Sequence, residues 1–205
     1  GQGEEVRIAG GAVRDALLGT VPDEIDLATT ALPDEIVRRA KAAGLKPVPT
    51  GIEHGTVTVV VDGRPFEVTT LRRDVETDGR HAVVAFGRDW EDDARRRDFT
   101  INGLFLDRDG NVHDFVGGRA DIKTCCIRFI GDAATRIRED YLRILRFFRF
   151  FARYADGEPD EEALHAAIAG REGLLGLSRE RVRVELLKTL VARRAADAFD
   201  ILSET

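Results

Sequence analysis

The first residues that could do chemistry lie between Ile8 and Thr29. Gly10 and Gly11 follow a short apolar run and precede a stretch with helical spacing. Glycines at the start of a helix let an anion approach free backbone N–H groups. Arg14, in the predicted first turn, could add a guanidinium fork to a bound phosphate. Such a turn is also common without any ligand, so this motif alone leaves both interpretations open.

Two carboxylates, Glu24 and Asp26, stand two positions apart in a predicted strand. Alternate residues of a strand share a face, and two carboxylates on one face repel each other unless a cation lies between them. Glu67 lies in a later predicted strand, Phe66 to Leu71, and its relevance depends on whether the two strands are neighbours. Taken alone, the pair is better explained by an exposed strand edge than by a metal site.

A third group, Asp140, Arg143 and Arg146, is spaced three residues apart in an arginine-rich stretch predicted as one helix over residues 133–154. This spacing places side chains on one helical face. A carboxylate acceptor beside a guanidinium matches the polar edge of a nucleobase. An ordinary intrahelical salt bridge is the alternative, and without other evidence it is the better explanation.

The composition limits the class of protein. A chain of 205 residues with 43% hydrophobic and 33% charged residues predicts a soluble globular protein of one large or two small domains. No apolar run approaches the roughly 20 residues that span a bilayer, and no basic and apolar leader is present. Because the chain starts with Gly and contains no Met, we expect its natural start to lie elsewhere.

Charge and cysteine usage restrict partners and compartment. A net charge of −6 argues against non-specific coating of nucleic acid, although a local basic face suffices for RNA. The neighbouring residues Cys125 and Cys126 lie in a predicted strand, where they would point to opposite faces and not bridge. Free thiols favour a reducing compartment, and we therefore expect a cytoplasmic protein.

The elements that must position these residues change in character along the chain. Short predicted strands alternate with helices up to Gly131, and no strand signal follows it. Residues 72–90 lack a clear period and are predicted as a long loop, and residues 125–130 as the last strand. The pattern predicts an α+β domain over residues 1–131 and an all-helical domain over residues 132–205.

Seven motifs occur in an order that resembles the class II tRNA nucleotidyltransferase family, which includes CCA-adding enzymes and related bacterial poly(A) polymerases. The motifs are GGAVRDALLG, PDEIDLAT, FEVTTLRRD, DGRH, RRRDFTINGLFLD, REDYLRILRFFRF and LSRERVRVELLK. The resemblance implies a polymerase-β-type head with a mixed sheet over residues 1–131. It also implies a helical neck and the start of a body over residues 132–205, with the rest of a tRNA-gripping body and tail beyond them.

The resemblance assigns catalysis to three carboxylates. Glu24 and Asp26 match the metal-binding pair of the family, and Glu67 matches its supporting third acidic position. Mg²⁺ is the expected ion, since hard carboxylate and phosphate oxygens suit it. Glu24 departs from the Asp-x-Asp pattern of the family. The extra methylene moves a carboxylate by about 1.5 Å, and a misplacement of that order can lower a rate roughly 10²-fold.

The resemblance also implies a set of nucleotide-binding residues. The glycine turn would hold the triphosphate, and Arg97, Asp98 and Asn102 of the RRRDFTIN motif would contact the sugar and phosphates. Asp140 and Arg143 would read the incoming base, first cytosine and then adenine, with the segment Asp74 to Trp90 enabling the switch. The complete set is Gly10, Gly11, Arg14, Arg97, Asp98, Asn102, Asp140, Arg143 and Arg146.

These roles imply a template-independent RNA nucleotidyltransferase that adds C and A residues to the 3′ end of tRNA from CTP and ATP and releases pyrophosphate. Alternatives within the same chemistry are a CC-adding enzyme, an A-adding enzyme and a poly(A) polymerase. A non-catalytic RNA-binding protein, in which Glu24 marks a decayed metal site, is the alternative from another class. The expected partners are the tRNA 3′ end and the two nucleotides, without a membrane, and the sequence determines no oligomeric state.

Overall fold

The structure is a computed structural model that describes residues 3–49, 51–78 and 81–204, without the side chains of residues 74–84. Its contacts group the chain into two compact units. The first comprises Gly1–Glu76, Ala82–Arg97 and Ile101–Gly118, and the second comprises Thr77–His81, Asp98–Thr100 and Arg119–Thr205. Residues 119–131 therefore group with the helices, whereas the sequence placed a domain boundary at residue 131. The division into a head over 1–131 and a neck over 132–205 stays a prediction.

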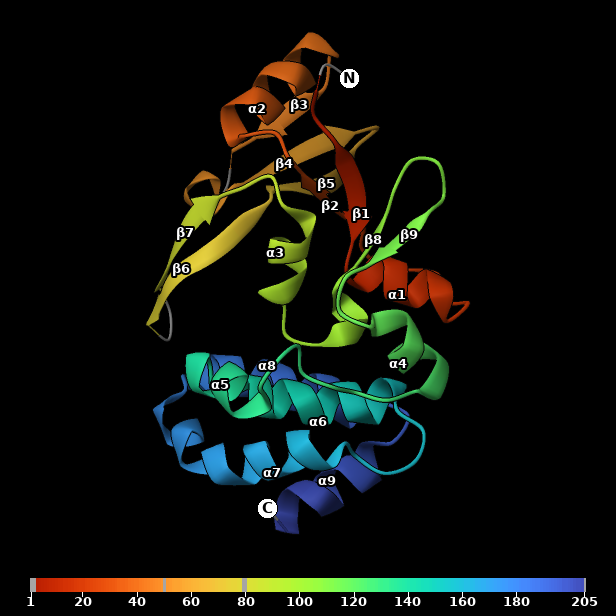
Figure 1. Cartoon of the computed structure of the whole chain (residues 1–205), viewed down its shortest axis with the longest axis vertical. Coiled ribbons are helices and arrows are strands. Elements are labelled where there is room, and N and C mark those ends of the chain that lie inside the picture. Colours follow the sequence, from red (N-terminus) through yellow and green to blue (C-terminus); the bar gives the residue numbers. More distant parts are fainter. Residues whose placement is uncertain (1–2, 50, 79–80, 205) are drawn as a thin grey trace. The chain divides into compact units, whose positions relative to one another are not determined.

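A seven-stranded sheet forms the centre of the first unit, in the order β3-β4-β5-β2-β1-β8-β9 (Figure 1). Among the described residues, only β2 and β5 are parallel neighbours and the other strand pairs of this sheet run antiparallel, so the sheet is mixed as predicted. Between β4 and β5 both turn residues, Asp62 and Gly63, have positive φ, as the tightest hairpin turns require. The strands are β1 Val6–Ala9, β2 Asp26–Thr29, β3 Lys46–Val48, β4 Thr56–Val61, β5 Arg64–Thr70, β8 Leu104–Leu106 and β9 Val112–Asp114.

Helices cover both faces of this sheet. Successive strand residues point to opposite faces, so Leu27 and Ala28 belong to different sides. Helix α2 (Pro33–Ala42) packs on the Leu27 side, and α3 (Trp90–Arg95) packs on the Ala28 side. The unit also contains two further short helices, α1 (Gly11–Leu17) after β1 and the 3-10 helix η1 (Ile52–His54) before β4, and most of a third, the 3-10 helix η2 (Thr100–Asn102). Asp26 lies two residues before Ala28 and shares its face, at the strand start that α3 leaves solvent-exposed.

The second unit is helical. Within it α6 packs against α8 and α9, and α5 packs against α7. The four phenylalanines of α6 are buried and therefore belong to the core of this unit. None of the described helices is both long and apolar enough to cross a membrane. The helices are α4 Gly118–Thr124, which leads into the unit, α5 Ala133–Glu139, α6 Leu142–Tyr154, α7 Glu161–Gly170, η3 Arg171–Gly176, α8 Arg179–Leu190 and α9 Ala195–Glu204.

Two predicted segments differ from the structure. Within the described residues, the expected loop over 72–90 contains β6 (Arg72–Asp78) and β7 (His81–Phe86), which pair as a two-stranded sheet. An Asp-Gly pair such as Asp78-Gly79 is typical of hairpin turns, and the loop prediction did not take it into account. Gly79 and Arg80 themselves lie outside the described residues. The strand predicted over residues 125–130 is also absent from the described chain. There α4 ends, Cys125 has a φ of 51°, and only Phe129 makes a bridge.

The cysteines are free, as predicted, although the strand expected to separate their side chains is absent from the described residues. Cys125 and Cys126 are both half-buried and free of disulfides.

Candidate active site

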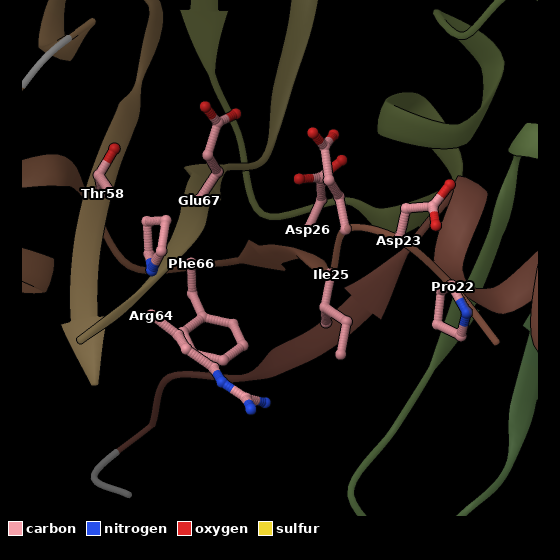
Figure 2. Close-up of a pocket in the computed structure, with 10 residues that line it drawn as sticks. Pro22, Asp23, Ile25, Asp26, Thr58, Arg64, Phe66 and Glu67 are labelled. Atoms are coloured by element: carbon pink, nitrogen blue, oxygen red, sulfur yellow. The ribbon is translucent and has the colours of Figure 1, made fainter. Parts of the chain in front are cut away.

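Asp26 and Glu67 occupy matching positions on neighbouring parallel strands. β2 pairs with β5 from Leu27 and Val68 onward, and continuing this register by one residue places Asp26 beside Glu67. Paired residues on neighbouring strands point to the same face, and Figure 2 shows both carboxylates directed to the same side. The condition that the sequence set for Glu67, a strand next to that of Asp26, is therefore met.

The structure places Glu24 in an irregular segment before β2, whereas the sequence predicted it in the same strand as Asp26. It nevertheless acts on its neighbour. Partial burial first, and the charge of Glu24 second, raise the pKa of Asp26 above its ordinary value, while Arg97 opposes them. No hydrogen bond or ion pair joins the carboxylates of Glu24, Asp26 or Glu67 to another residue in the described part of the chain. Carboxylates that repel each other and lack protein partners suit a cation.

The residues fit one particular kind of metal site. Among the described residues, no group of three or more His, Cys, Asp or Glu side chains could hold a metal ion by itself. Mg²⁺ is usually held by one or two carboxylates and completes its shell with waters and substrate phosphates. Glu24 and Asp26 match that open arrangement, in which the protein supplies only part of the shell.

Two cavities meet at the carboxylates. The larger, of about 640 Å³, opens between residues 22–26 and 64–67 (Figure 2). The smaller, of about 270 Å³, also has Asp26 and Glu67 in its lining and adds the side chains of Arg72, Arg96 and Arg97. The two carboxylates thus border both a hollow lined by arginines, which suits phosphate groups, and a larger hollow on their other side.

Two of the three arginines of the smaller cavity, Arg96 and Arg97, are held by Asp93 of α3. Its carboxylate, 1% exposed, accepts from Nε of Arg96 at 2.8 Å and from Nη2 of Arg97 at 2.9 Å. Burial would raise the pKa of Asp93, but the two guanidiniums outweigh burial and hold it below its ordinary value. Sequence reasoning missed Asp93, Arg72 and Arg96. An acid three and four residues before two arginines was the available signal for Asp93.

The glycine turn is built around Gly10. This residue has a φ of +65°, its N–H donates to the carbonyl of Leu104 at 2.9 Å, and its own carbonyl accepts from two amides of α1. A Cβ here would lie 2.9 Å from Nη1 of Arg97. Only glycine combines this backbone with such a close guanidinium. Gly11 begins α1, under the side chain of Arg14.

Arg14 and Asn102 tie the turn to the segment after α3. Arg14 is 6% exposed and donates from Nε to Asp15 at 2.8 Å and from Nη1 to Oδ1 of Asn102 at 2.6 Å. Asn102 ends the 3-10 helix η2 (Thr100–Asn102), and its carbonyl accepts from Arg97 at 3.4 Å. The structure thus brings Gly10, Arg14, Arg97 and Asn102 together, as the motifs suggested. Their contacts with a nucleotide stay predictions.

Asp98 and Arg146 form a separate group in the second unit. Nε of Arg146 donates to Oδ2 of Asp98 at 2.9 Å. The segment around Asp98 is anchored there, because the amide of Ile130 donates to the Asp98 carbonyl at 3.0 Å. Next to it, the ring of Phe99 lies 4.8 Å from those of Phe129 and Phe150.

The predicted row of base-reading residues on one continuous helix is wrong. α5 ends at Glu139, Asp140 is extended with φ −159° and ψ 106°, and α6 begins at Leu142. One physical reason is a local turn: Oδ1 of Asp140 accepts from the Leu142 amide two residues on, at 3.1 Å, which satisfies a donor at the start of α6. Arg143 does not pair with Asp140 but with Glu139, and it donates to the Arg136 carbonyl at 2.7 Å.

Tyr141 fixes the position of this helix break. Its ring fills the space above two glycines, Gly170 and Gly173. A Cβ on Gly173 would lie 2.0 Å from a Tyr141 ring carbon, and one on Gly170 would lie 2.7 Å from Ile137. The absence of side chains at these glycines therefore lets the backbone at Asp140 and Tyr141 settle against α7 and η3.

Comparison with known proteins identifies the family of this chain. Residues 6–128 match the family described as the poly A polymerase head domain. The chain belongs to this family. The resemblance drawn from the ordered motifs is confirmed, and the polymerase-β-type head with its mixed sheet agrees with it.

Several named relatives align with the chain over nearly its whole length. It is 49% identical to the Danio rerio protein named CCA tRNA nucleotidyltransferase 1, mitochondrial, over 98% of this chain and 47% of that protein. A crystal structure of the Bacillus stearothermophilus CCA-adding enzyme in complex with CTP is similar with a TM-score of 0.88 at 38% identity, covering 99% of this chain and 48% of that one. A tRNA nucleotidyltransferase complexed with a primer tRNA and an incoming ATP analog is similar with a TM-score of 0.80 at 26% identity, covering 98% and 57%. The chain spans about half the length of these relatives.

Proposed function

We propose that this chain is the nucleotide-binding and catalytic part of an RNA nucleotidyltransferase that adds C and A residues to the 3′ end of tRNA from CTP and ATP. The observation that carries the proposal is the pair Asp26 and Glu67, unpartnered within the described residues and bordering an arginine-lined hollow. The names of the relatives, which include CCA-adding enzymes, support the same chemistry.

The first unit supplies the residues for phosphoryl transfer. Glu24 and Asp26 would hold Mg²⁺, with Glu67 as the third carboxylate beside them. Bound there, the ion would supply Lewis-acid stabilisation of phosphate charge. Arg97 would neutralise phosphate oxygens from the smaller cavity, beside the turn of Gly10 and Gly11. Positioning and charge neutralisation are the main contributions that proteins make to such a transfer.

The second unit supplies the residues for choosing the base. Asp140 is an acceptor and Arg143 is a donor, a combination that complements cytosine or adenine edges. Asp98 and Arg146, which pair with each other, and the buried residues Arg14 and Asn102 complete the proposed nucleotide-binding set. In this view these four residues mainly hold neighbouring groups in place, because their side chains are already engaged with protein partners.

An incorporation assay tests the proposal. The full-length protein that contains this chain is incubated with Mg²⁺, a tRNA lacking its CCA end, and labelled CTP or ATP, supplied separately and together. Incorporation by the wild type and its loss in Asp26→Asn are expected. Addition of C alone, of A alone, or of long A tails would identify the CC-adding, A-adding or poly(A) alternatives. Retained tRNA binding with no incorporation from any nucleotide would instead identify a non-catalytic RNA-binding protein.

Glu24→Asp decides what the unusual carboxylate does. If the extra methylene misplaces the carboxylate, restoring Asp should raise the rate of incorporation, by up to about 10²-fold. An unchanged or lower rate would show that the irregular segment before β2 has adapted to Glu24. Glu24→Gln is the matched loss variant and should reduce incorporation in either case, because it removes the charge.

The compartment and the identity of the ion also belong to the proposal. We expect Mg²⁺ and a cytoplasmic protein, the latter from the two free cysteines. The Danio rerio relative is named mitochondrial, so fractionation of cells that express the full-length protein is the measurement that distinguishes the two compartments.

A further inference from the structure

The carboxylate of Asp140 is oriented by two contacts. Its backbone lies in the break between α5 and α6, so no helix surface dictates where the side chain points. Oδ1 accepts from the Leu142 amide at 3.1 Å, and Oδ2 accepts from Nη2 of Arg181 at 2.6 Å. The side chains of Asp140 and Arg181 are 24% and 33% exposed. The carboxylate is therefore held on both oxygens while still open to a ligand.

Arg181 is itself held in place by the way α8 packs on α6. Four residues further along α8, and so on the same helical face, Glu185 is 5% exposed. Glu185 accepts from Nε of Arg149 at 2.5 Å and lies 3.7 Å from Nη1 of Arg146. A buried carboxylate between two guanidiniums fixes the register of the two helices, because shifting either would leave a buried charge unpaired. The packing of α8 on α6 therefore fixes the position from which the Arg181 guanidinium contacts Asp140.

We propose that Arg181 is a positioning residue for nucleotide choice, which it exerts by orienting the carboxylate of Asp140. The inference rests on the proposed function, in which Asp140 reads the incoming base. An oriented carboxylate is an acceptor for the exocyclic amino group of cytosine or adenine, whereas uracil presents a carbonyl oxygen at the corresponding position. With one oxygen committed to Leu142 and the other to Arg181, the free lone pairs have fixed directions. Without Arg181 the carboxylate rotates, and the contrast between CTP and UTP falls.

Binding measurements on the 205-residue chain test this. Calorimetric titration with CTP and with UTP in MgCl₂ gives the ratio of the two dissociation constants. Arg181→Gln should reduce the preference for CTP by about tenfold, the size of one hydrogen bond to a charged group. Arg181→Lys keeps the charge and a donor and should restore most of the preference. Arg183→Gln is the matched control on the same helix, since Arg183 is exposed and forms no ion pair within the described residues; it should leave the ratio unchanged.

The double variant shows whether Arg181 acts through Asp140. If it does, Arg181→Gln added to Asp140→Ala should cause no further loss of preference. A purely structural role would instead weaken binding of CTP and UTP alike and leave their ratio at the wild-type value, which would overturn the inference. Melting temperatures of all variants are measured alongside to identify any that fail to fold. If Arg181→Gln fails to fold, Arg181→Ala takes its place and should show the same loss of preference.

Failure of the proposed function has a different signature. In that case the wild-type chain shows no preference for CTP over UTP, and Asp140→Ala changes nothing; the inference then falls with it. A clear wild-type preference that Asp140→Ala removes and Arg181→Gln preserves would refute the role of Arg181 alone.

Discussion

Asp26 combines partial burial, a neighbouring carboxylate and no hydrogen-bond or ion-pair partner within the described residues. A carboxyl group whose pKa is raised by folding binds its proton more tightly in the folded chain than in the unfolded chain. Stability therefore falls as the pH rises from the ordinary pKa of 3.8 through the raised folded value. At neutral pH the charge on Asp26 destabilises the fold, as is common where a residue serves a site and not the core.

Replacing this charge should stabilise the protein. We expect Asp26→Asn to melt at a higher temperature than the wild type at pH 7 in EDTA, with a difference that shrinks as the pH falls toward 3.8. MgCl₂ should raise the melting temperature of the wild type and not that of Asp26→Asn. Asp23→Asn is the control, because Asp23 lies on the same irregular segment but points away from Asp26 in Figure 2. A lower melting temperature for Asp26→Asn in EDTA would contradict this interpretation.

At the scale of elements, the site depends on close approaches that only glycine allows. The turn before α1 brings Gly10 against Arg97, whose guanidinium is also held by Asp93 of α3. In the second unit, η3 brings Gly173 against Tyr141, next to Asp140. In both places the absence of a glycine side chain lets two elements pack closely. This close packing positions Arg97 in the first case and Asp140 in the second, both proposed nucleotide-binding residues.

Gly10→Ala and Gly19→Ala separate backbone conformation from contact. Both glycines have positive φ, but a Cβ on Gly19 meets nothing within 4 Å. Gly19→Ala should lower the free energy of unfolding by about 1–2 kcal/mol, the cost of a left-handed alanine. Gly10→Ala should lower it further and weaken CTP binding, because Arg97 is displaced. Urea denaturation and CTP titration measure the two effects; equal losses of stability with intact CTP binding would argue against the contact.

Gly173→Ala should disturb the break between α5 and α6. A methyl group at this position overlaps the Tyr141 ring, and we expect a loss of about 1–3 kcal/mol in the free energy of unfolding from overpacking. The preference for CTP over UTP should fall as well, since Asp140 moves with its neighbour. Gly176→Ala, with open space around the added Cβ, serves as the comparison and should preserve both quantities. If Gly173→Ala lowers the free energy of unfolding but leaves the preference for CTP over UTP unchanged, then Tyr141 has no part in base choice.

At the scale of the whole molecule, the chain carries a net charge of −6 and spans about half the length of its relatives. A protein with this balance has little general attraction for the RNA backbone. We therefore expect the 205-residue chain to bind CTP and ATP but to bind tRNA lacking CCA more weakly than the Danio rerio relative does. Filter binding of both proteins at one salt concentration checks this. Equal tRNA affinities would show that the matched half is sufficient.

The sequence by itself determined the change from a mixed α and β part to a helical part, and it determined the family. Turn residues, strand alternation and helical spacing are local properties, so an α+β part followed by helices could be predicted. The same patterns placed Asp26 and Glu67 on two strands. Ordered motifs added what local patterns could not, because separately the glycine turn and the carboxylate pair each have a simpler explanation.

Only the tertiary structure decided which residues meet. The parallel pairing of β2 with β5, which sets Asp26 beside Glu67, depends on a crossover between distant segments. The helix break at Asp140 depends on Tyr141 settling over Gly173, and the Arg181 contact joins residues 41 positions apart. Such partners are selected by packing and charge pairing in the folded chain, and no periodicity within one segment encodes them.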